Sequence, residues 1–347
     1  MTKTMASFRH ILTRFSRISP IAGHRSDRVL CRSYVKSLYE DAFTIDSAWT
    51  PVTADVSKSI NGSIFTNQNV EFGSKRFYRG RVKGVIFDWG GTVVDCGVCA
   101  PILTFVELFK NEGVDINEDE ARTISGSNRK ANIAQILDRE AVRQRWVTAT
   151  GREPTSDDVQ RMYDNFIPQV LSSLTKYSNV IEGVAEVVKQ LKKQPFNLRI
   201  GSTTGYPKEV LKVLLNASSS QGFTPDASVC LGEVPEANPS PFMLWLCAIR
   251  LGLQPIESIV KVDDSVNGVA EGLLAGTWTV AIAKTSSYVG LNEHQLDELR
   301  APELRARLQR AYDALSGSGA HYIIDTISDL PAVIDDINRR LTNGEKP

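Results

Sequence analysis

The sequence contains no long run of apolar residues and no block of basic ones. No stretch approaches the roughly 18 consecutive apolar residues that indicate a membrane-spanning helix, so we expect no membrane partner. The 40 Lys and Arg balance 40 Asp and Glu at a formal net charge of zero, which gives no reason to expect nucleic-acid binding. With 347 residues, 42% of them hydrophobic, the chain has the composition of one large globular domain or two smaller ones.

Histidine and cysteine are scarce as well. The four histidines are scattered, which does not favour a metal site built from imidazoles. The five cysteines are an odd number in a long chain, so they do not indicate a disulfide framework. Cys96 and Cys99 form a C-x-x-C pair, but a zinc site of four cysteines would need a second pair. We interpret this pair as small side chains at the boundary between two domains.

Acidic residues are absent from the first 26 residues. Four arginines recur there among serines, and apolar residues stand opposite them at helical spacing. This pattern is typical of an organelle transit peptide, and the spacing of Arg32 and Tyr34 resembles a mitochondrial processing site. We therefore predict a transit peptide over residues 1–34 and a location in the mitochondrial matrix, with a plastid or a disordered basic tail as alternatives. Residues 35–80 lack a sustained period, and we interpret them as a linker or loose extension.

The first strong pattern in the remaining chain is an apolar run, "VKGVIF", that ends on Asp88. It predicts a short buried strand that leads into a turn containing Gly90, Gly91 and Thr92. Glycine at two positions leaves backbone N–H groups free to approach an anion. The strand therefore presents a carboxylate to a turn that is able to bind phosphate.

The rest of the chain divides into a helical part and an alternating part. Helical patterns cover residues 100–113 and 155–174, and no convincing strand lies between them. Further along, predicted strands alternate with helices, which indicates a parallel sheet covered on both faces. We predict a doubly wound α/β core over residues 81–95 and 183–340, with an inserted helical domain over residues 96–182.

Three of the predicted strands end in polar clusters, at Asp88, at residues 202–205 and at residues 263–265. Ligand chemistry in parallel sheets lies at the carboxyl ends of the strands, so these clusters could converge. Their carboxylates would repel one another unless a hard cation lay among them, and Mg²⁺ suits oxygen ligands. Asp88 could then attack phosphorus, while hydroxyls and backbone N–H groups bind the phosphate. For each cluster alone, the alternative is a helix cap or a turn.

Three motifs resemble those of the haloacid dehalogenase superfamily. "FDWGGTVVD" is similar to its first motif, "STTG" to its second and "VKVDDSVNGVAEGLLAG" to its fourth. Within the superfamily, the chain resembles the phosphonoacetaldehyde hydrolase (phosphonatase) family over about residues 81–340, and the helical insert stands where that family has its cap. The resemblance implies cleavage of a C–P bond to acetaldehyde and phosphate. A cap lysine would form a Schiff base with the aldehyde, and a core aspartate would take the phosphoryl group.

The resemblance also implies roles for individual residues. Asp88 would be the nucleophile, and its carboxylate would hold Mg²⁺ together with the Gly90 carbonyl and Asp264. The residues implied to bind substrate or phosphate are Thr92, Thr204, Gly205 and Tyr206. The implied partner is a small phosphonate or phosphate substrate. A homodimer is also expected, because the family dimerises through its cap and the predicted helix near residues 101–110 has apolar faces.

Four positions depart from the family pattern. Arg129 stands where the imine-forming lysine should be, and an arginine stays protonated and forms no imine. We predict that the neighbouring Lys130 serves instead, which requires a shift in helix register because helical neighbours point about 100° apart. Asn132 replaces a histidine, Asn238 replaces the cation of the third motif, and Gly268 replaces the later aspartate of the fourth motif.

These departures leave two other functions open. Another Mg²⁺-dependent phosphohydrolase would need Asp88 and the metal-binding acids but no imine, and a catalytically silent relative would only bind a ligand. The adjacent acids in "VDDS" resemble those of the sugar-phosphate mutase branch, so Asp263 could replace the acid lost at Gly268. Lys208 and Lys261 are near the motifs in sequence, but we assign neither of them the role of the lost cation.

Overall fold

The computed structural model describes residues 59–60, 64–65, 78–122 and 129–347. The predicted transit peptide, residues 1–34, lies outside the described residues. Within the predicted extension, two short strands pair in antiparallel fashion, β1 (Ser59–Ile60) and β2 (Ile64–Phe65). The transit peptide and its cleavage site therefore stay predictions.

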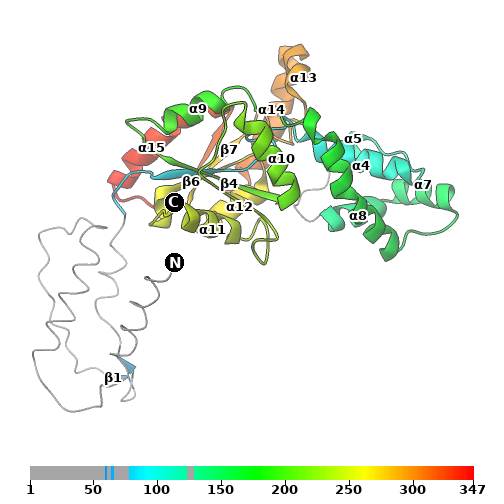
Figure 1. Ribbon diagram of the computed structural model, residues 1–347, viewed down its shortest axis with the longest axis horizontal. Helices are drawn as coiled ribbons and strands as arrows, with labels where there is room; N and C mark the ends of the chain where they lie inside the picture. The colour runs from blue at the N-terminus through cyan, green and yellow to red at the C-terminus, as the bar shows by residue number, and fades with distance from the viewer. Residues whose placement is uncertain (1–58, 61–63, 66–77, 123–128) are drawn as a thin grey trace, which may run out of the picture. The chain divides into compact units, whose positions relative to one another are not determined.

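The unit from Phe72 to the end of the chain is built on a parallel sheet, which has six strands in the part that the structure describes (Figure 1). The strands are β3 (Gly84–Phe87), β4 (Arg199–Pro207), β5 (Ala227–Leu231), β6 (Ile259–Asp263), β7 (Trp278–Ile282) and β8 (Tyr322–Ile324). The order across the sheet is β5-β4-β3-β6-β7-β8, so β3 lies between β4 and β6. The carboxyl ends of these three strands meet at one edge, where parallel sheets bind their ligands.

Helices cover both faces of this sheet, which confirms the predicted doubly wound α/β class. The helices described after the insert are α9 (Val184–Leu191), α10 (Lys208–Ser219), α11 (Phe242–Leu251), α12 (Val266–Ala275), α13 (Glu293–Glu298), α14 (Ala301–Ser316) and α15 (Leu330–Thr342), with 3₁₀ turns at Ile256–Ser258 and Ile327–Asp329. Ile86 packs in one cluster with Met243 and Leu244 of α11, whereas Val85 and Phe87 belong to a second cluster. Alternate side chains of a strand point to opposite faces, so β3 is buried on both. Figure 1 shows α11 and α12 on one side of the sheet and α9 and α15 on the other.

The regular elements described in the insert between β3 and α9 are helices, as predicted. Its helices are α4 (Cys99–Asn111), α5 (Glu118–Arg122), α6 (Arg129–Leu137), α7 (Glu140–Thr150) and α8 (Ser156–Ser173), followed by a 3₁₀ turn at Leu174–Lys176. Helix α8 starts with a capping box, in which the side chains of Thr155 and Asp158 each accept a hydrogen bond from the other residue's backbone N–H. The predicted domain boundaries at residues 96 and 182 stay predictions.

Helix α4 buries its apolar residues inside the insert. Phe105 is buried and its ring centroid lies 5.0 Å from that of Phe166 in α8, and Leu108 and Phe109 are buried as well. These side chains are therefore occupied by packing within the insert. The apolar face of this helix gives no support to the expected homodimer, which stays a prediction.

Cys96 and Cys99 are buried at the start of the insert. The Cys96 thiol donates to the Leu291 carbonyl at 3.3 Å, and the Cys99 thiol donates to the Cys96 carbonyl at 3.5 Å. Burial raises the pKa of Cys96 to about 12, so this thiol stays protonated and does not suit a metal ion. Both side chains therefore fit the structural interpretation of the C-x-x-C pair.

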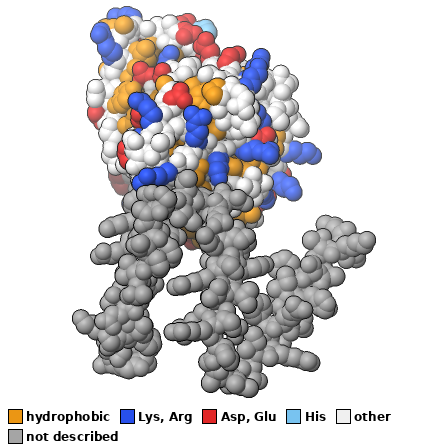
Figure 2. Space-filling model, turned by 90° about the vertical axis from the view of Figure 1, so that its left-hand side faces the viewer, with side chains coloured by type: hydrophobic (Ala, Val, Ile, Leu, Met, Phe, Trp, Pro, Cys, Tyr) orange, Lys and Arg blue, Asp and Glu red, His pale blue; other side chains and the backbone are white. Residues whose placement is uncertain are grey.

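Two features of the described residues concern apolar helices and surface charge. None of the described helices is long and apolar enough to cross a membrane. On the face that Figure 2 shows, basic side chains are interspersed with acidic ones and do not gather into one block. These observations do not test the expected absence of membrane and nucleic-acid partners.

Candidate active site

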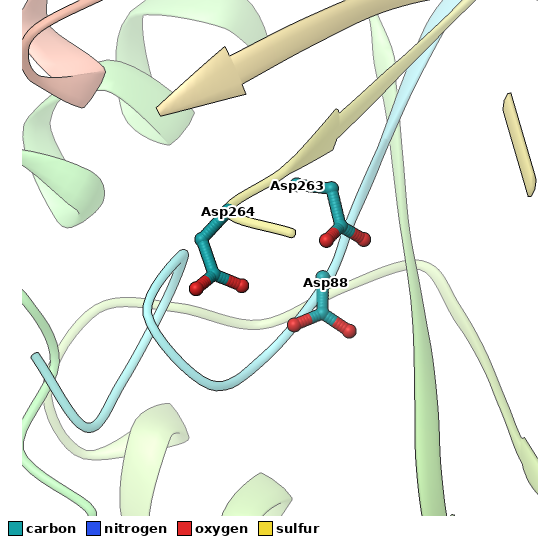
Figure 3. Close-up of side chains that lie close together, drawn as sticks. All are labelled: Asp88, Asp263 and Asp264. Atoms are coloured by element: carbon teal, nitrogen blue, oxygen red, sulfur yellow. The ribbon is translucent and has the colours of Figure 1, made fainter. Parts of the chain in front are cut away.

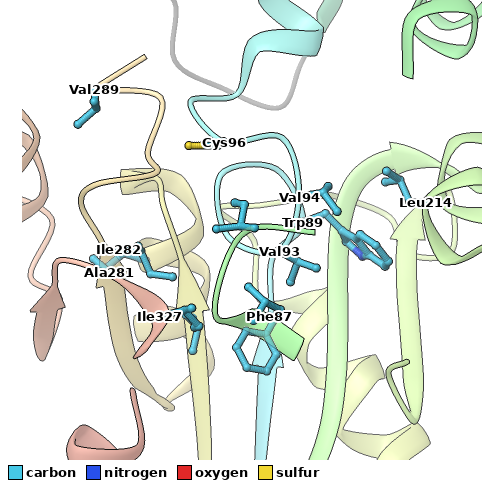
Figure 4. Packing of buried hydrophobic residues seen from close by; sticks show 14 of the residues in the cluster. Phe87, Trp89, Val93, Val94, Cys96, Leu214, Ala281, Ile282, Val289 and Ile327 are labelled. Atoms are coloured by element: carbon cyan, nitrogen blue, oxygen red, sulfur yellow. The ribbon is translucent and has the colours of Figure 1, made fainter. Parts of the chain in front are cut away.

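The packing around the end of β3 fixes the direction of Asp88. Phe87 and Trp89, on either side of it, are fully buried (Figure 4). Each of them meets the ring of Phe223 edge-on, at centroid distances of 6.0 and 5.5 Å. Adjacent residues of an extended chain point in opposite directions, so Asp88 points away from this apolar core. The backbone N–H of Asp88 donates to the Val262 carbonyl at 2.9 Å, which extends the pairing with β6 up to the carboxylate.

The turn after Asp88 requires glycine at position 91. Gly91 has a φ of +75°, and a Cβ there would lie 2.6 Å from Oδ2 of Asp264. The N–H groups of Val93 and Val94 donate to the Trp89 carbonyl at 2.8 and 2.9 Å and close the turn. Glycine therefore lets the turn lie directly against a second carboxylate.

The carboxylates of Asp88, Asp263 and Asp264 meet at the ends of β3 and β6 (Figure 3). One oxygen from each lies within 4.8 Å of the other two. Ser265 donates to Oδ1 of Asp263 from its N–H at 3.0 Å and from its hydroxyl at 2.7 Å. The N–H of Ser287 donates to Oδ2 of Asp264 at 3.0 Å. The structure thus brings together the carboxylates that the sequence pattern placed at separate strand ends.

Burial and mutual repulsion oppose ionisation of this cluster. Burial raises the pKa of Asp88 well above its usual range, and the charge of Asp263 raises it further. Burial and the charge of Asp263 likewise raise the pKa of Asp264 to about 8. A divalent cation would relieve this repulsion, and a donor set made only of carboxylate oxygens suits a hard cation. The residues present therefore fit a divalent metal ion.

Lys261 is a buried cation beside these carboxylates. Its Nζ donates to the Thr203 hydroxyl at 2.7 Å and forms ion pairs with Asp263 at 3.2 Å and Glu271 at 3.0 Å. Burial alone would lower the pKa of Lys261, but the carboxylates of Glu271, Asp263 and Asp88 raise it above its usual value. The side chain therefore carries a permanent positive charge. Sequence reasoning missed this role because the partners of Lys261 come from three separate elements.

A cavity of about 180 Å³ lies against the carboxylate cluster. The core contributes Asp88, Asp264 and residues 204–206 to its lining, and the helical insert contributes Arg122 and Arg129. The predicted phosphate-binding residues of the second motif thus face the same space as the predicted nucleophile. This space is bounded by carboxylates on the core side and by guanidinium groups on the insert side.

Two other predicted positions differ in their access to this cavity. Thr92 is fully buried, does not line the cavity, and its hydroxyl has no hydrogen-bond partner among the described residues. A direct contact of Thr92 with phosphate, as predicted, does not fit this geometry. Asn238 does line the cavity, where it brings an amide and no charge.

Comparison with known proteins identifies the family. A family model described as haloacid dehalogenase-like hydrolase matches residues 82–276. The phosphonoacetaldehyde hydrolase of Paraburkholderia phytofirmans is 40% identical over 266 residues, which cover 77% of this chain and 99% of the relative. The chain belongs to the phosphonoacetaldehyde hydrolase family of the haloacid dehalogenase-like hydrolases.

Other members of the phosphonoacetaldehyde hydrolase family are similar over nearly their whole length. The phosphonoacetaldehyde hydrolase of Syntrophobacter fumaroxidans is 36% identical over 270 residues, which cover 78% of this chain and 97% of the relative. A crystal structure of a phosphonoacetaldehyde hydrolase-like protein from Oleispira antarctica superimposes with a TM-score of 0.74 at 36% identity, covering 78% of this chain and 98% of that one. The resemblance seen in the motifs therefore extends to the whole fold.

In this family member, helix α6 of the cap directs Arg129 into the cavity and Lys130 away from it. Arg129 is half-buried and lines the cavity. Lys130 is exposed, does not line the cavity, and donates to Oε1 of Gln160 at 2.5 Å. The predicted imine-forming role of Lys130 therefore does not fit this arrangement of α6. Asn132, at the position of the family histidine, is buried and does not line the cavity either.

Asp263 fills the space next to Gly268. Gly268 lies in the first turn of α12, and a Cβ there would lie 1.8 Å from Oδ2 of Asp263. A side chain at position 268 and the present position of Asp263 therefore exclude each other. This supports the hypothesis that Asp263 supplies the acid that the fourth motif lacks at position 268.

Because a side chain at position 268 would overlap Asp263, changes at these two positions should have strongly non-additive effects on the free energy of unfolding. Gly268→Ala should lower the free energy of unfolding by roughly 1–3 kcal/mol, because the added methyl group overlaps a buried carboxylate. In an Asp263→Ala background the same change should cost far less, and denaturant unfolding of both pairs of variants would measure the difference. Gly317→Ala is the control, since a Cβ there meets no atom closer than 3.6 Å. An equal cost of Gly268→Ala in both backgrounds would contradict the exclusion.

The loop after β7 is a part of the site that sequence reasoning missed. The hydroxyl of Thr285 donates to the Gly91 carbonyl at 2.6 Å, and Ser287 holds Asp264 through its N–H. "KTSSY" follows β7 as the other polar clusters follow β3 and β6. The same rule, applied to this strand end, would have pointed to these residues.

Proposed function

We propose that this protein is a metal-dependent hydrolase that transfers the phosphoryl group of a small phosphonate to Asp88, with cleavage of the C–P bond. The observation that carries the proposal is the position of Asp88, which lies among three strand ends and lines a small cavity together with residues 204–206. Relatives named phosphonoacetaldehyde hydrolase, at 36–40% identity, support the type of bond.

The residues divide the reaction between them. Asp88 attacks phosphorus and the C–P bond breaks. The electron pair of the broken bond moves onto the oxygen of a carbonyl group that is bonded to the leaving carbon. Thr204 and the backbone of Gly205 bind phosphoryl oxygens, and water then releases phosphate from Asp88. Mg²⁺, held by the three carboxylates and the Gly90 carbonyl, would offset the charge of the phosphoryl oxygens. Lys261 keeps Asp263 in place by its ion pair.

A second candidate is hydrolysis of a phosphate ester. It is favoured by one observation, that Arg129 lines the cavity at the family's lysine position. An oxygen leaving group needs no imine to accept the electron pair, whereas a carbon leaving group needs an electron sink. The roles of Asp88 and the metal are the same in both candidates.

Phosphate release distinguishes the two candidates. Phosphonoacetaldehyde and 2-hydroxyethyl phosphate would each be incubated with the protein and Mg²⁺, and again with a chelator in excess. Release from the phosphonate supports C–P cleavage, and release from the ester alone supports the second candidate. Absence of release from these two probes and from their analogues that carry a carboxylate, with Mg²⁺ bound, would contradict the proposed phosphoryl transfer and favour a catalytically silent relative.

Metal binding should depend on pH. The carboxyl groups of Asp88 and Asp264 have raised pKa values, that of Asp264 about 8, so near neutral pH a metal must displace protons. The apparent affinity for Mg²⁺ should therefore rise between about pH 6 and 8, by up to about tenfold per pH unit for each proton released. Calorimetry in two buffers of different ionisation enthalpy would count these protons. Affinity independent of pH, without proton release, would contradict the raised pKa values.

Two further proposals concern the location and assembly of the protein. We propose the mitochondrial matrix, with a plastid as the alternative, from the arginine-rich pattern of residues 1–34. Imaging a fluorescent protein fused behind these residues, with and without their arginines, would test it. The homodimer expected from the family is tested by light scattering of the full chain.

A further inference from the structure

Arg129 is held by two aromatic rings where the cap meets the core. Its guanidinium carbon lies 5.8 Å from the ring centroid of Phe166 in α8 and 5.6 Å from that of Tyr206 in β4. Both distances are within the range of cation–π contacts. Burial raises the pKa of Tyr206 to about 12, so this ring stays neutral beside the guanidinium. The guanidinium carries its five N–H donors in one plane, a geometry that suits a planar anion.

The other guanidinium in the cavity has a structural role. Arg122 donates to the Gly97 carbonyl at 2.7 Å and lies 3.4 Å from Glu118, on its own helix. It therefore ties α5 to the start of the insert. Arg129 contacts a ring of the cap and a ring of the core, and it lines the same cavity as Asp88 and Asp264.

Two groups in the lining of the cavity favour different parts of a substrate. The carboxylates suit a metal ion and the phosphoryl group, as proposed above. Arg129 favours an anion, and the planar fork of a guanidinium matches a carboxylate with two parallel hydrogen bonds. At about 180 Å³ the cavity is smaller than the roughly 300–1,000 Å³ of sites for drug-sized ligands, so it admits a few atoms beyond the phosphoryl group.

We infer that Arg129 binds a carboxylate on the leaving group, so that the substrates are small phosphono-carboxylic acids or phosphate esters of small hydroxy acids. The inference rests on the proposed phosphoryl transfer to Asp88 and names its substrate class. An arginine at this position replaces covalent recognition of an aldehyde by ionic recognition of an acid.

The chemistry balances for 3-phosphonopyruvate, which is phosphonoacetaldehyde with the aldehyde hydrogen replaced by a carboxylate. An oxygen of Asp88 bonds to phosphorus, the C–P bond breaks, and the electron pair forms the enolate of pyruvate. A proton from water adds to the carbon, and a water molecule hydrolyses the phosphorylated Asp88. The products are pyruvate and phosphate, and one water is consumed.

Binding tests the inference without turnover. Calorimetry with Mg²⁺ present would compare phosphonoacetate with ethylphosphonate, which differ by a carboxylate in place of a methyl group. We expect the acid to bind roughly 10- to 150-fold more tightly, the range for hydrogen bonds to charged groups. Arg129→Met should remove this preference. Arg143→Met, which removes an exposed arginine of the same cap, should keep it.

Turnover separates the inference from the proposed function. Two pairs of substrates are compared by kcat/KM: 3-phosphonopyruvate with phosphonoacetaldehyde, and phosphoglycolate with 2-hydroxyethyl phosphate. In the wild type kcat/KM should be higher for the acid of each pair, and in Arg129→Met this preference should fall. No preference in the wild type, or an equal loss on acid and neutral substrates in Arg129→Met, would overturn the inference. Selective binding of the acid without turnover of any probe would instead contradict the proposed function but would support the carboxylate site at Arg129.

Discussion

Asp88→Asn should lower phosphate release by at least about 1,000-fold, because an amide is a poor nucleophile and the aspartyl-phosphate intermediate can no longer form. The fold should be kept, since Asn has nearly the same shape and the backbone N–H of residue 88 still pairs with Val262. Single-turnover assays with the most active probe would measure the loss. Mass spectrometry of the quenched wild type should show a phosphoryl group on Asp88.

The pH dependence of stability provides a second, independent test of Asp88→Asn. Because burial raises the pKa of Asp88, the folded state binds its proton more strongly than the unfolded state does. Without metal, wild-type stability should therefore fall as pH rises above about 4, and Asp88→Asn should be spared this loss. Thermal unfolding in a chelator at about pH 8 should place the variant at or above the wild type.

Exposed Asp297 on α13 provides the matched control for the nucleophile. Asp297→Asn should change neither phosphate release nor its dependence on metal. If Asp88→Asn kept more than about a tenth of the wild-type rate, the phosphoryl group would have to be transferred to another acceptor, and the assignment of Asp88 would fail.

Sequence alone predicted the parts of the site that depend on local pattern. Asp88 and Asp264 each follow a short buried strand, and the carboxyl ends of parallel strands share one edge of the sheet. The apolar runs that predict these strands, and the position of an acid after each run, were therefore enough to propose that the carboxylates meet. The glycines of the first turn could be assigned in the same way, because a chain that turns sharply after a strand favours φ values that glycine adopts easily.

Residues whose role depends on strand order or helix register could not be predicted in this way. Lys261 on β6 donates to Thr203 on β4, and Ser287 after β7 donates to Asp264 after β6, so both contacts depend on the strand order β4-β3-β6-β7. Thr92 follows the glycine pair in sequence, but the turn buries it beneath the cavity surface. For helices, the sequence pattern did not predict which of two adjacent side chains faces the cavity. A shift of one residue changes the direction of a side chain by about 100°, and Lys130 was predicted where Arg129 lies.

Position 129 lines the cavity and position 130 does not, so a lysine at position 129 should strongly change imine trapping by borohydride. With phosphonoacetaldehyde and borohydride, the wild type should form no reduced adduct in the cap, because Arg129 forms no imine and Lys130 lies outside the cavity. Arg129→Lys should be labelled at position 129 in most molecules. The amine introduced there would lie in a partly desolvated cavity near the positive charge of Arg122, and both conditions favour its neutral, nucleophilic form.

Peptide mass mapping of the reduced protein would locate the adduct, and Lys130→Ala in both backgrounds is the control. Labelling of Arg129→Lys that persists in the double variant would show that position 129 faces the substrate and position 130 does not. Labelling of the wild type that disappears in Lys130→Ala would show the reverse. In that case α6 must rotate on substrate binding, the original prediction for Lys130 would hold, and the carboxylate role inferred for Arg129 would lose its geometric basis.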